Sequence, residues 1–277
     1  MSMQLSTHVT YLMCPDCKSK VEISDDFLLC MSCRRVFHQP NGVFDMLPMA
    51  SPEDIKFYSD PDYIRGQSIL PRFHELLYDK DSISGKIELY FKRNLMSIAE
   101  EIHEPILDIG CGAGNLFPFY GNEKKIIGVD ISRPLLETCK SKYPDSLCIH
   151  CDMTSPPIKP NSIRTIFSSG ALEHVFFLEK LISEVDNILA TTGNFYILIP
   201  NEGGLAWKGL RLLAHFKFSR TLKINYKQFA EIEHCNKVVT VENVLYKFFK
   251  FKHIVRIPFR IGGTHINLVS LYHVTKR

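Results

Sequence analysis

Short apolar runs alternate with longer mixed stretches through the middle of the chain. Four runs, at residues 105–109, 125–130, 146–151 and 162–169, centre on Ile, Leu or Val, and glycine or polar residues follow each of them. Runs of this length are typical of strands buried on both faces of a parallel sheet, with helices in the spacers. Because the carboxyl ends of parallel strands meet at one edge, we expect the polar residues after these strands to lie together.

Other elements continue this alternation and predict an α/β fold. Residues 63–82 carry several aromatic residues without a clear period. The apolar pattern predicts helices over 83–102, 177–190 and 240–250, a fifth strand over 194–200, and two closing strands near 253–258 and 265–273.

A glycine-rich turn follows the first strand. Within the stretch 107–115, Gly110, Gly112 and Gly114 allow positive φ angles and let backbone N–H groups approach a ligand with no Cβ in the way. The second strand ends in Asp130, where a βαβ unit places a carboxylate that accepts hydrogen bonds from a ribose diol. Two simpler interpretations stay open: the glycines only make a turn, and Asp130 is an acid at a helix N-terminus.

Four motifs in a fixed order give the chain a specific resemblance. They are LDIGCGAGN at 107–115, GVDIS at 128–132, CDM at 151–153 and ALEHV at 171–175. Residues 83–200 thereby resemble the class I S-adenosylmethionine (SAM) dependent methyltransferases, in the methyltransferase-11/25-like subgroup. The glycine spacing does not fit the G-x-G-x-x-G of nicotinamide-binding domains. The resemblance implies a Rossmann-like seven-stranded sheet that ends in an antiparallel pair, with SAM as methyl donor and S-adenosylhomocysteine (SAH) as product.

The resemblance also implies roles for residues at the strand ends. Ile131 and Met153 would sandwich the adenine, and Asp152 would accept a hydrogen bond from its amine, unless Asp152 only forms a turn. His174 lies beside the expected methyl group, where it either takes a proton from the acceptor or only makes a loop hydrogen bond. The expected cofactor-binding residues are Asp108, Gly110, Cys111, Gly112, Gly114, Asp130, Ile131, Asp152, Met153, Ser169 and Glu173.

Nine cysteines divide into two groups. Cys14, Cys17, Cys30 and Cys33 form two C-x-x-C pairs with twelve residues between them. Each pair can direct two thiolates at one ion, so the spacing predicts a structural, tetrahedral zinc site with four cysteine ligands rather than two disulfides. The other five cysteines are expected to be small core residues.

The cysteine-rich segment has a resemblance of its own. Residues 11–48 join the C-x-x-C pairs to a strand-like stretch and resemble the zinc-ribbon modules related to the Trm112 family, which also begin certain ribosomal RNA methyltransferases. The predicted domains are a zinc ribbon at 1–48, a linker at 49–62 and the methyltransferase domain at 63–277, with a helical cap at 63–104 and an acceptor-side insertion at 201–236.

Composition places the chain among ordinary globular proteins. It has 277 residues, of which 45% are hydrophobic and 23% charged. The N-terminal residues do not form a secretory signal, and no apolar run approaches the ~20 residues that span a bilayer. We therefore expect a cytoplasmic protein.

Charge distinguishes the C-terminal part. Residues 201–277 carry nine Lys and five Arg against four Glu, a formal charge of +10, so the rest of the chain is −7 to give the total of +3. Residues 205–218 interleave cations with apolar residues and the single Trp. This segment predicts a lid over the acceptor pocket, with a lipid-surface helix and an RNA-binding surface as alternatives. His234 closes the insertion and is a second candidate acceptor-side histidine.

Three functions are compatible with these features. We favour a methyltransferase that acts on an O or N atom of a small-molecule or glycan acceptor, with anionic and lipid-linked acceptors among the options. The alternative is an RNA methyltransferase that grips RNA through the ribbon and the basic C-terminal part, although a pI near 8.3 gives little general phosphate affinity. A non-catalytic SAM-fold protein is the third.

Overall fold

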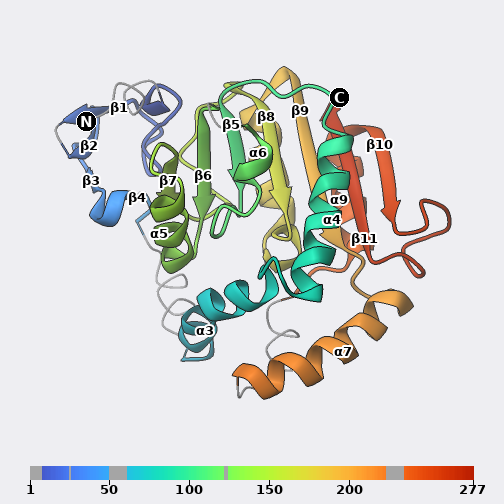
Figure 1. Ribbon diagram of the computed structural model, residues 1–277. Coiled ribbons are helices and arrows are strands. Elements are labelled where there is room, and N and C mark those ends of the chain that lie inside the picture. The colour runs from blue at the N-terminus through green and yellow to red at the C-terminus, as the bar shows by residue number, and fades with distance from the viewer. Residues whose placement is uncertain (1–7, 25, 50–60, 122–123, 223–233) are drawn as a thin grey trace.

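The computed structural model describes residues 8–24, 26–49, 61–121, 124–222 and 234–277. An eight-stranded mixed sheet runs through the centre, with helices packed against it (Figure 1). In spatial order its strands are β10 (Phe249–Ile257), β11 (Val269–Lys276), β9 (Leu189–Pro200), β8 (Ile163–Ser169), β5 (Ile106–Ile109), β6 (Ile126–Asp130), β7 (Leu147–His150) and β4 (Val43–Asp45).

The five predicted parallel strands form the centre of this sheet. β5 pairs in parallel with β6 and β8, β6 with β7, and β8 with β9. The two closing strands are antiparallel, β11 against β9 and β10 against β11. The predicted α/β class and the seven-stranded Rossmann-like sheet with its antiparallel end are therefore confirmed.

The N-terminal segment adds an eighth strand. β1 (Val21–Ser24), β2 (Phe27–Cys30) and β3 (Val36–His38) form a small antiparallel sheet. The chain then turns at Asn41, where φ is 56°, and β4 pairs in parallel with β7, Phe44 opposite Ile149. The domain boundary after residue 48 remains a prediction, but the last strand of the segment before it belongs to the large sheet.

Helices cover both faces of the sheet. In the described part of the chain they are α3 (Pro61–Leu77), α4 (Ile83–Ser97), α5 (Arg133–Lys142), α6 (Leu178–Ile188), α7 (Leu205–Leu222) and α9 (Val238–Phe248), together with the short 3-10 helices η1 (Pro40–Gly42), η2 (Phe117–Phe119) and η3 (Leu172–His174).

Three of these helices fall on predicted ranges, α5 lies in one of the three spacers where helices were expected, and no bounds were predicted for α3 and α7. The described residues of the other two spacers contain the 3-10 helix η2 and no α-helix. α6, α9 and α4 match the predicted segments, although α4 ends at Ser97 rather than at residue 102. The predicted helical cap at 63–104 contains most of α3, but the bounds of this helix could not be predicted because residues 63–82 show no apolar period. α7 fills a segment for which a helix was only one of the alternatives. Most of the predicted linker, residues 50–60, and residues 223–233 of the predicted insertion lie outside the described residues.

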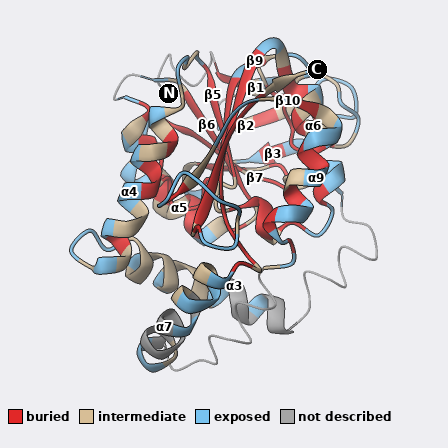
Figure 2. Cartoon of the chain, turned by 90° about the vertical axis from the view of Figure 1, so that its right-hand side faces the viewer, coloured by how far each residue is buried: buried red, intermediate tan, exposed pale blue. Residues whose placement is uncertain are grey.

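The buried residues form two apolar layers, one on each face of the sheet (Figure 2). α6 and α9 contribute to one layer, and α4 and α5 to the other. The first layer continues into the N-terminal segment, since Leu28, Phe37 and Phe44 belong to the same cluster as Leu107 and Ile149. The N-terminal segment and the large sheet therefore share one core. Within the described residues, no helix is long and apolar enough to cross a membrane.

The shared core predicts that a change in β4 destabilises the whole molecule. Phe44 is fully buried, so Phe44→Ala should lower the free energy of unfolding by about 3–5 kcal/mol in urea titrations followed by circular dichroism. Phe259 is 60% exposed, and Phe259→Ala is the control, with a change within about 0.5 kcal/mol. An unaltered unfolding midpoint for Phe44→Ala would contradict the shared core.

Candidate active site

A cavity of about 290 Å³ opens at the carboxyl ends of β5, β6 and β8. Figure 1 shows α3 and α7 lying beyond this edge of the sheet, and residues of α3, α4 and α7 complete the cavity wall. The predicted site residues that line it are Asp108, Gly110, Cys111, Gly112, Asp130, Ile131, Met153, Ser169, Glu173, His174 and His234. The structure therefore brings together all of the predicted cofactor and acceptor residues except Gly114 and Asp152.

The turn after β5 requires glycine at its cavity-facing positions. At Gly110 φ is 72°, and an added Cβ would lie 2.3 Å from the Cβ of Ala171. At Gly112 φ is 51°, and an added Cβ would lie 3.3 Å from Cε1 of His74 on α3. Side chains there would strain the backbone and fill the space between the turn and its neighbours. The turn thus brings bare backbone to the cavity.

Asp130 joins this turn to the next strand. Its carboxylate accepts hydrogen bonds from the backbone N–H of Gly112, at 2.8 Å, and of Ser132, at 2.7 Å. Burial raises the pKa of Asp130, while these N–H groups act in the opposite direction. Each carboxylate oxygen keeps a lone pair for a further donor, as hydroxyl groups of a ribose would require.

Asp108 lies near the end of β5, just before the glycine turn, and is 2% exposed. The hydroxyl of Tyr120 donates a hydrogen bond to it at 2.9 Å. The pKa of Asp108 is raised to about 7, mainly by burial and in part by the nearby Asp130, while the Tyr120 hydrogen bond and Lys92 oppose the rise. The carboxyl group is therefore ready to lose its proton when a cation enters the cavity.

Two predicted residues have other positions. Gly114 does not line the cavity, and an added Cβ would meet Sγ of Cys139 at 2.7 Å, so its absence of a side chain serves packing. The carboxylate of Asp152 accepts the backbone N–H of Thr154 at 2.7 Å, which closes a turn, and Asp152 is not among the lining residues. Their roles in cofactor binding remain predictions.

Acid and imidazole groups also line the cavity, on η3 and just before α9. The rings of His174 and His234 meet edge to face, with centroids 4.6 Å apart. Glu202 links this group to α7, because its Oε1 lies 3.0 Å from Nδ1 of His234 and accepts the indole N–H of Trp207 at 2.6 Å. Glu173 is 2% exposed, and burial raises its pKa to about 7. These groups can hold and exchange protons near a bound molecule.

A helical cap was predicted at 63–104, but the residues that this segment contributes to the cavity wall were not identified from the sequence. His74, Tyr78, Glu88 and Lys92 all line the cavity. Lys92 is 5% exposed, its Nζ lies 3.9 Å from the ring centroid of Tyr78, and burial lowers its pKa to about 8. The sequence did contain one signal for these wall residues: Glu88 and Lys92 are opposite charges, four residues apart, within the apolar pattern of the predicted helix.

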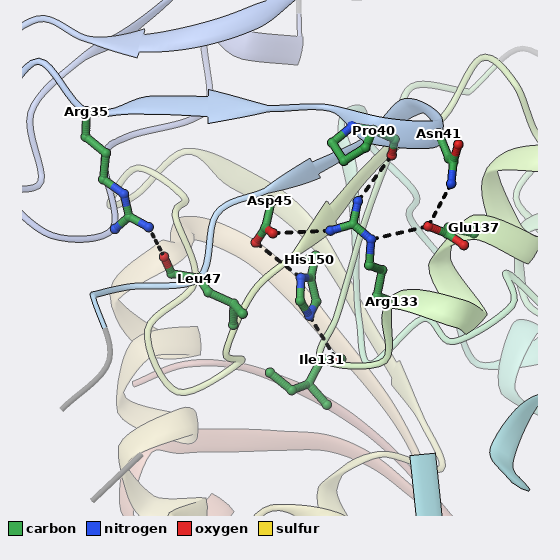
Figure 3. Close-up of polar contacts among 9 residues, drawn as sticks. All are labelled: Arg35, Pro40, Asn41, Asp45, Leu47, Ile131, Arg133, Glu137 and His150. Atoms are coloured by element: carbon green, nitrogen blue, oxygen red, sulfur yellow. Dashed lines mark hydrogen bonds and ion pairs between the residues drawn. The ribbon is translucent and has the colours of Figure 1, made fainter. Parts of the chain in front are cut away.

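The N-terminal segment reaches the loop that carries Ile131. Figure 3 shows the ring of His150, on β7, between Asp45 of β4 and the Ile131 carbonyl, at 3.2 Å and 3.1 Å. Arg133, at the start of α5, pairs with the Asp45 carboxylate at 3.2 Å and donates to the Pro40 carbonyl at 3.3 Å. β4 therefore helps to hold the loop that borders the cavity.

Comparison with known families agrees with this geometry. Residues 107–197 match the sequence profile of a family described as a methyltransferase domain. The matched range begins in β5 and ends within β9, and it contains the glycine turn and Asp130. This part of the chain is a class I SAM-dependent methyltransferase domain.

Curated relatives of the methyltransferase domain cover part of the chain. It is 25% identical over 146 residues, 50% of this chain and 58% of the relative, to the ubiquinone/menaquinone biosynthesis C-methyltransferase UbiE of Campylobacter jejuni. An uncharacterized methyltransferase of Oceanobacillus iheyensis is 32% identical over 111 residues, 38% of this chain and 52% of that protein. The chain thus spans about half the length of the curated relatives that it matches.

Solved structures share the fold of the methyltransferase domain. A SAM-dependent methyltransferase of Thermotoga maritima, described as a possible histamine N-methyltransferase, has a TM-score of 0.56 at 14% identity over 78% of this chain and 100% of its own. The geranyl diphosphate C-methyltransferase of Streptomyces coelicolor, solved with SAH, has a TM-score of 0.52 at 13% identity over 70% and 80% of the two chains. At these identities the likeness shows the fold alone.

The residues of the cavity fit SAM. The glycine turn leaves bare backbone at the cavity, as the predicted amino-acid end of SAM requires, and Asp130 lines the same cavity with oxygens able to accept further hydrogen bonds, as a ribose requires. Among the described residues, Oε2 of Glu173, Nδ1 of His74 and Oγ of Ser132 are buried without a hydrogen-bond partner, and all three residues line the cavity. Buried polar atoms of this kind need a partner, which a polar ligand would supply.

The raised carboxyl pKa values predict how SAM binding depends on pH. Asp108 and Glu173, with pKa values of about 7, keep their protons at pH 6 in the cofactor-free protein. A sulfonium cation favours the ionised carboxyls, so SAM should bind about tenfold more tightly at pH 8 than at pH 6 in calorimetric titrations. SAH lacks the positive sulfur and is the matched control, with a clearly smaller pH effect.

The same pKa values predict how the free energy of unfolding of the cofactor-free protein changes with pH. A carboxyl group with a raised pKa keeps its proton in the folded state but not in the unfolded one, so stability should fall as the pH rises from about 4 to about 7. Glu173→Gln should reduce both pH effects. Equal pH dependence for SAM and SAH would show that these carboxyls do not face the sulfur.

Proposed function

We propose that the protein transfers the methyl group of SAM to an O or N atom of a small organic acceptor. The observation that carries this proposal is that one cavity is lined both by the glycine turn and Asp130 and by Glu173, His174 and His234. The methyl donor end and a set of proton-accepting groups thus share one enclosed space. The family of the domain supports SAM as donor.

The cavity residues have two tasks in this reaction. SAM supplies an activated methyl group, so a lone pair of the acceptor forms the new bond while the sulfur keeps the electrons of the broken C–S bond and SAH leaves. The protein must align the acceptor with the methyl group and receive the proton that the acceptor atom loses. Glu173, in its ionised form, and the neutral imidazoles of His174 and His234 are the candidate proton acceptors.

The lining of the cavity narrows the acceptor class. Four of its residues are acidic, Glu88, Asp108, Asp130 and Glu173, and one is a lysine, Lys92. Leu70, Phe73, Ile87, Phe91, Trp207 and Leu210 add apolar and aromatic surface. An acceptor with an apolar body and a neutral or cationic group suits this wall better than an anionic one. Glycan and lipid-linked acceptors of that kind stay within the proposal.

α7 supports the interpretation of residues 205–218 as a lid. Trp207 and Leu210 line the cavity, and Trp207 is tied to Glu202 beside His234. The RNA alternative keeps the +10 charge of residues 201–277 in its favour. The acidic cavity wall disfavours a phosphate-rich substrate at the methyl group.

A cytoplasmic location remains a prediction from the sequence.

A labelled-methyl transfer screen tests this proposal. Purified protein and methyl-labelled SAM are added to cell extract that has been separated into small-molecule, lipid-linked and RNA fractions. Label should enter the small-molecule or lipid-linked fraction. Label confined to RNA would replace the proposal with the RNA function, and SAM binding with no labelled product would favour a non-catalytic protein.

Matched variants show whether the label comes from this cavity. Gly110→Ala and Asp130→Ala should lower incorporation at least about tenfold, because the first closes the backbone approach and the second removes the ribose acceptor. Gly209 lies in α7 with nothing within 4 Å of an added Cβ, so Gly209→Ala should keep activity. Equal loss in all three variants would point to a general folding defect.

We also propose that Cys14, Cys17, Cys30 and Cys33 hold a structural zinc ion. The four sulfur atoms lie within 4.8 Å of one another, with Cys14 to Cys33 at 3.7 Å and Cys17 to Cys30 at 3.4 Å. Tetrahedral zinc with Zn–S bonds of about 2.3 Å places its sulfurs ~3.8 Å apart, so the cluster fits the ion. The group also fits the predicted zinc ribbon.

Metal analysis of purified protein tests the zinc proposal. Cys14→Ser should remove one zinc per chain relative to the parent protein and lower its melting temperature, since the ribbon shares the core of the sheet. Cys235 is an exposed cysteine outside the cluster, and Cys235→Ser should leave the metal content unaltered. An identical zinc content in Cys14→Ser and the parent would reject the site.

A further inference from the structure

A buried imidazole on β11 has one nitrogen without a partner. His273 is 3% exposed, and its Nε2 lies 2.7 Å from Oδ1 of Asn194 on β9. Nδ1 of the same ring is buried and has no hydrogen-bond partner among the described residues. An orphaned polar atom at such depth costs free energy unless something binds it.

The hydrogen bond to Asn194 decides what this nitrogen offers. An amide oxygen only accepts, so Nε2 of His273 carries the proton and Nδ1 carries a lone pair. A neutral imidazole with one nitrogen bound to an oxygen acceptor is the usual form of a metal-ligating histidine.

Two further ligand groups lie beside His273. His253 is its direct partner across the β10–β11 ladder, and a bulge between Phe251 and His253 interrupts the alternation of β10 at this point. The two imidazole rings stack, with centroids 5.6 Å apart. Glu100, in the loop after α4, places Oε1 3.2 Å from Nε2 of His253. One ligand atom from each of the three residues lies within 4.8 Å of the other two.

We propose that Glu100, His253 and His273 form a second metal site, which binds a divalent transition ion such as Zn²⁺. Two imidazoles and a carboxylate are a donor set that suits such an ion, with solvent in the remaining position. Tetrahedral zinc requires its ligand atoms to be ~3.4 Å apart. The side chains of Glu100 and His253 are 63% and 44% exposed, so small rotations bring them to that distance.

The site is separate from the methyl-transfer cavity. None of its three residues lines the cavity, and His273 pairs with Tyr196, four residues before the end of β9. An ion there would fasten the outer strands β10 and β11 to the loop after α4. Because α4 carries Glu88 and Lys92 into the cavity wall, the ion would fix the position of that wall from outside.

A nearby pair provides the control. Nε2 of His103 lies 3.4 Å from Oε2 of Glu101, so this pair resembles His253 and Glu100 in exposure and composition. No third ligand group of the described residues completes it. The two places therefore differ in one respect: the buried imidazole of His273 lies beside His253 and Glu100, and no such group lies beside His103 and Glu101 among the described residues.

Metal counting on the full, tag-free chain tests the proposal. Each protein is equilibrated with Zn²⁺, dialysed and analysed for zinc, and its melting temperature is measured with and without added Zn²⁺. The parent and His103→Gln should hold one more zinc per chain than His253→Gln and Glu100→Gln. Added Zn²⁺ should raise the melting temperature of the first two more than that of the others. Calorimetry should show at least tenfold weaker binding of this ion in His253→Gln.

The comparison between variants does not depend on the zinc of the ribbon, because all four proteins retain the cysteines. The substituted residues are exposed, so misfolding does not obscure the result. Equal zinc content and equal melting temperatures in the parent and His253→Gln would overturn the proposal and leave Glu100 and His253 as an ion pair.

Discussion

The hydrogen bond from the backbone of Gly112 to the carboxylate of Asp130 is the constraint on which the cavity depends. It joins the ends of two neighbouring parallel strands and fixes the turn between β5 and η2. The turn can approach Asp130 only because Gly110 and Gly112 have positive φ and no side chains. Because β5 and β6 are adjacent parallel strands, their carboxyl ends lie at one edge of the sheet, and this brings the two partners together. Glycine in the turn and a carboxylate at the end of β6 then make the contact.

Above this edge, residues of α3, α4 and α7 add walls to the cavity and make it a partly enclosed space. Enclosure makes ionised carboxyl groups unfavourable, which is why the pKa values of Asp108 and Glu173 rise. A cationic cofactor reverses that penalty, since its charge compensates the carboxylates that the protein cannot hydrate. The buried carboxyl groups of the cavity therefore favour a positively charged ligand.

The strands and the glycine turn could be predicted because their signals are local: a short apolar run, then glycine at fixed spacing. The bounds of α3 and its cavity residues could not, because its residues show no apolar period and its contact with the cavity exists only in the folded chain. His74 was missed for the same reason. Asp152 follows a family motif, yet its carboxylate forms a local turn. The β4–β7 pairing and the Glu100–His253–His273 cluster join residues far apart in sequence, which no local pattern records.

The pairing of β4 with β7 also changes what the sheet presents to other molecules. Without β4, β7 would be an edge strand, with its buried Leu147, Cys148 and Ile149 beside a row of open backbone donors and acceptors. Such an edge is a template for another chain. The three residues of β4 cover it, and the salt bridge between Asp45 and Arg133 holds the cover in place. The cysteine-rich segment thus moves the edge of the sheet from β7 to β4, a strand of three residues, and short edge strands offer little to pair with.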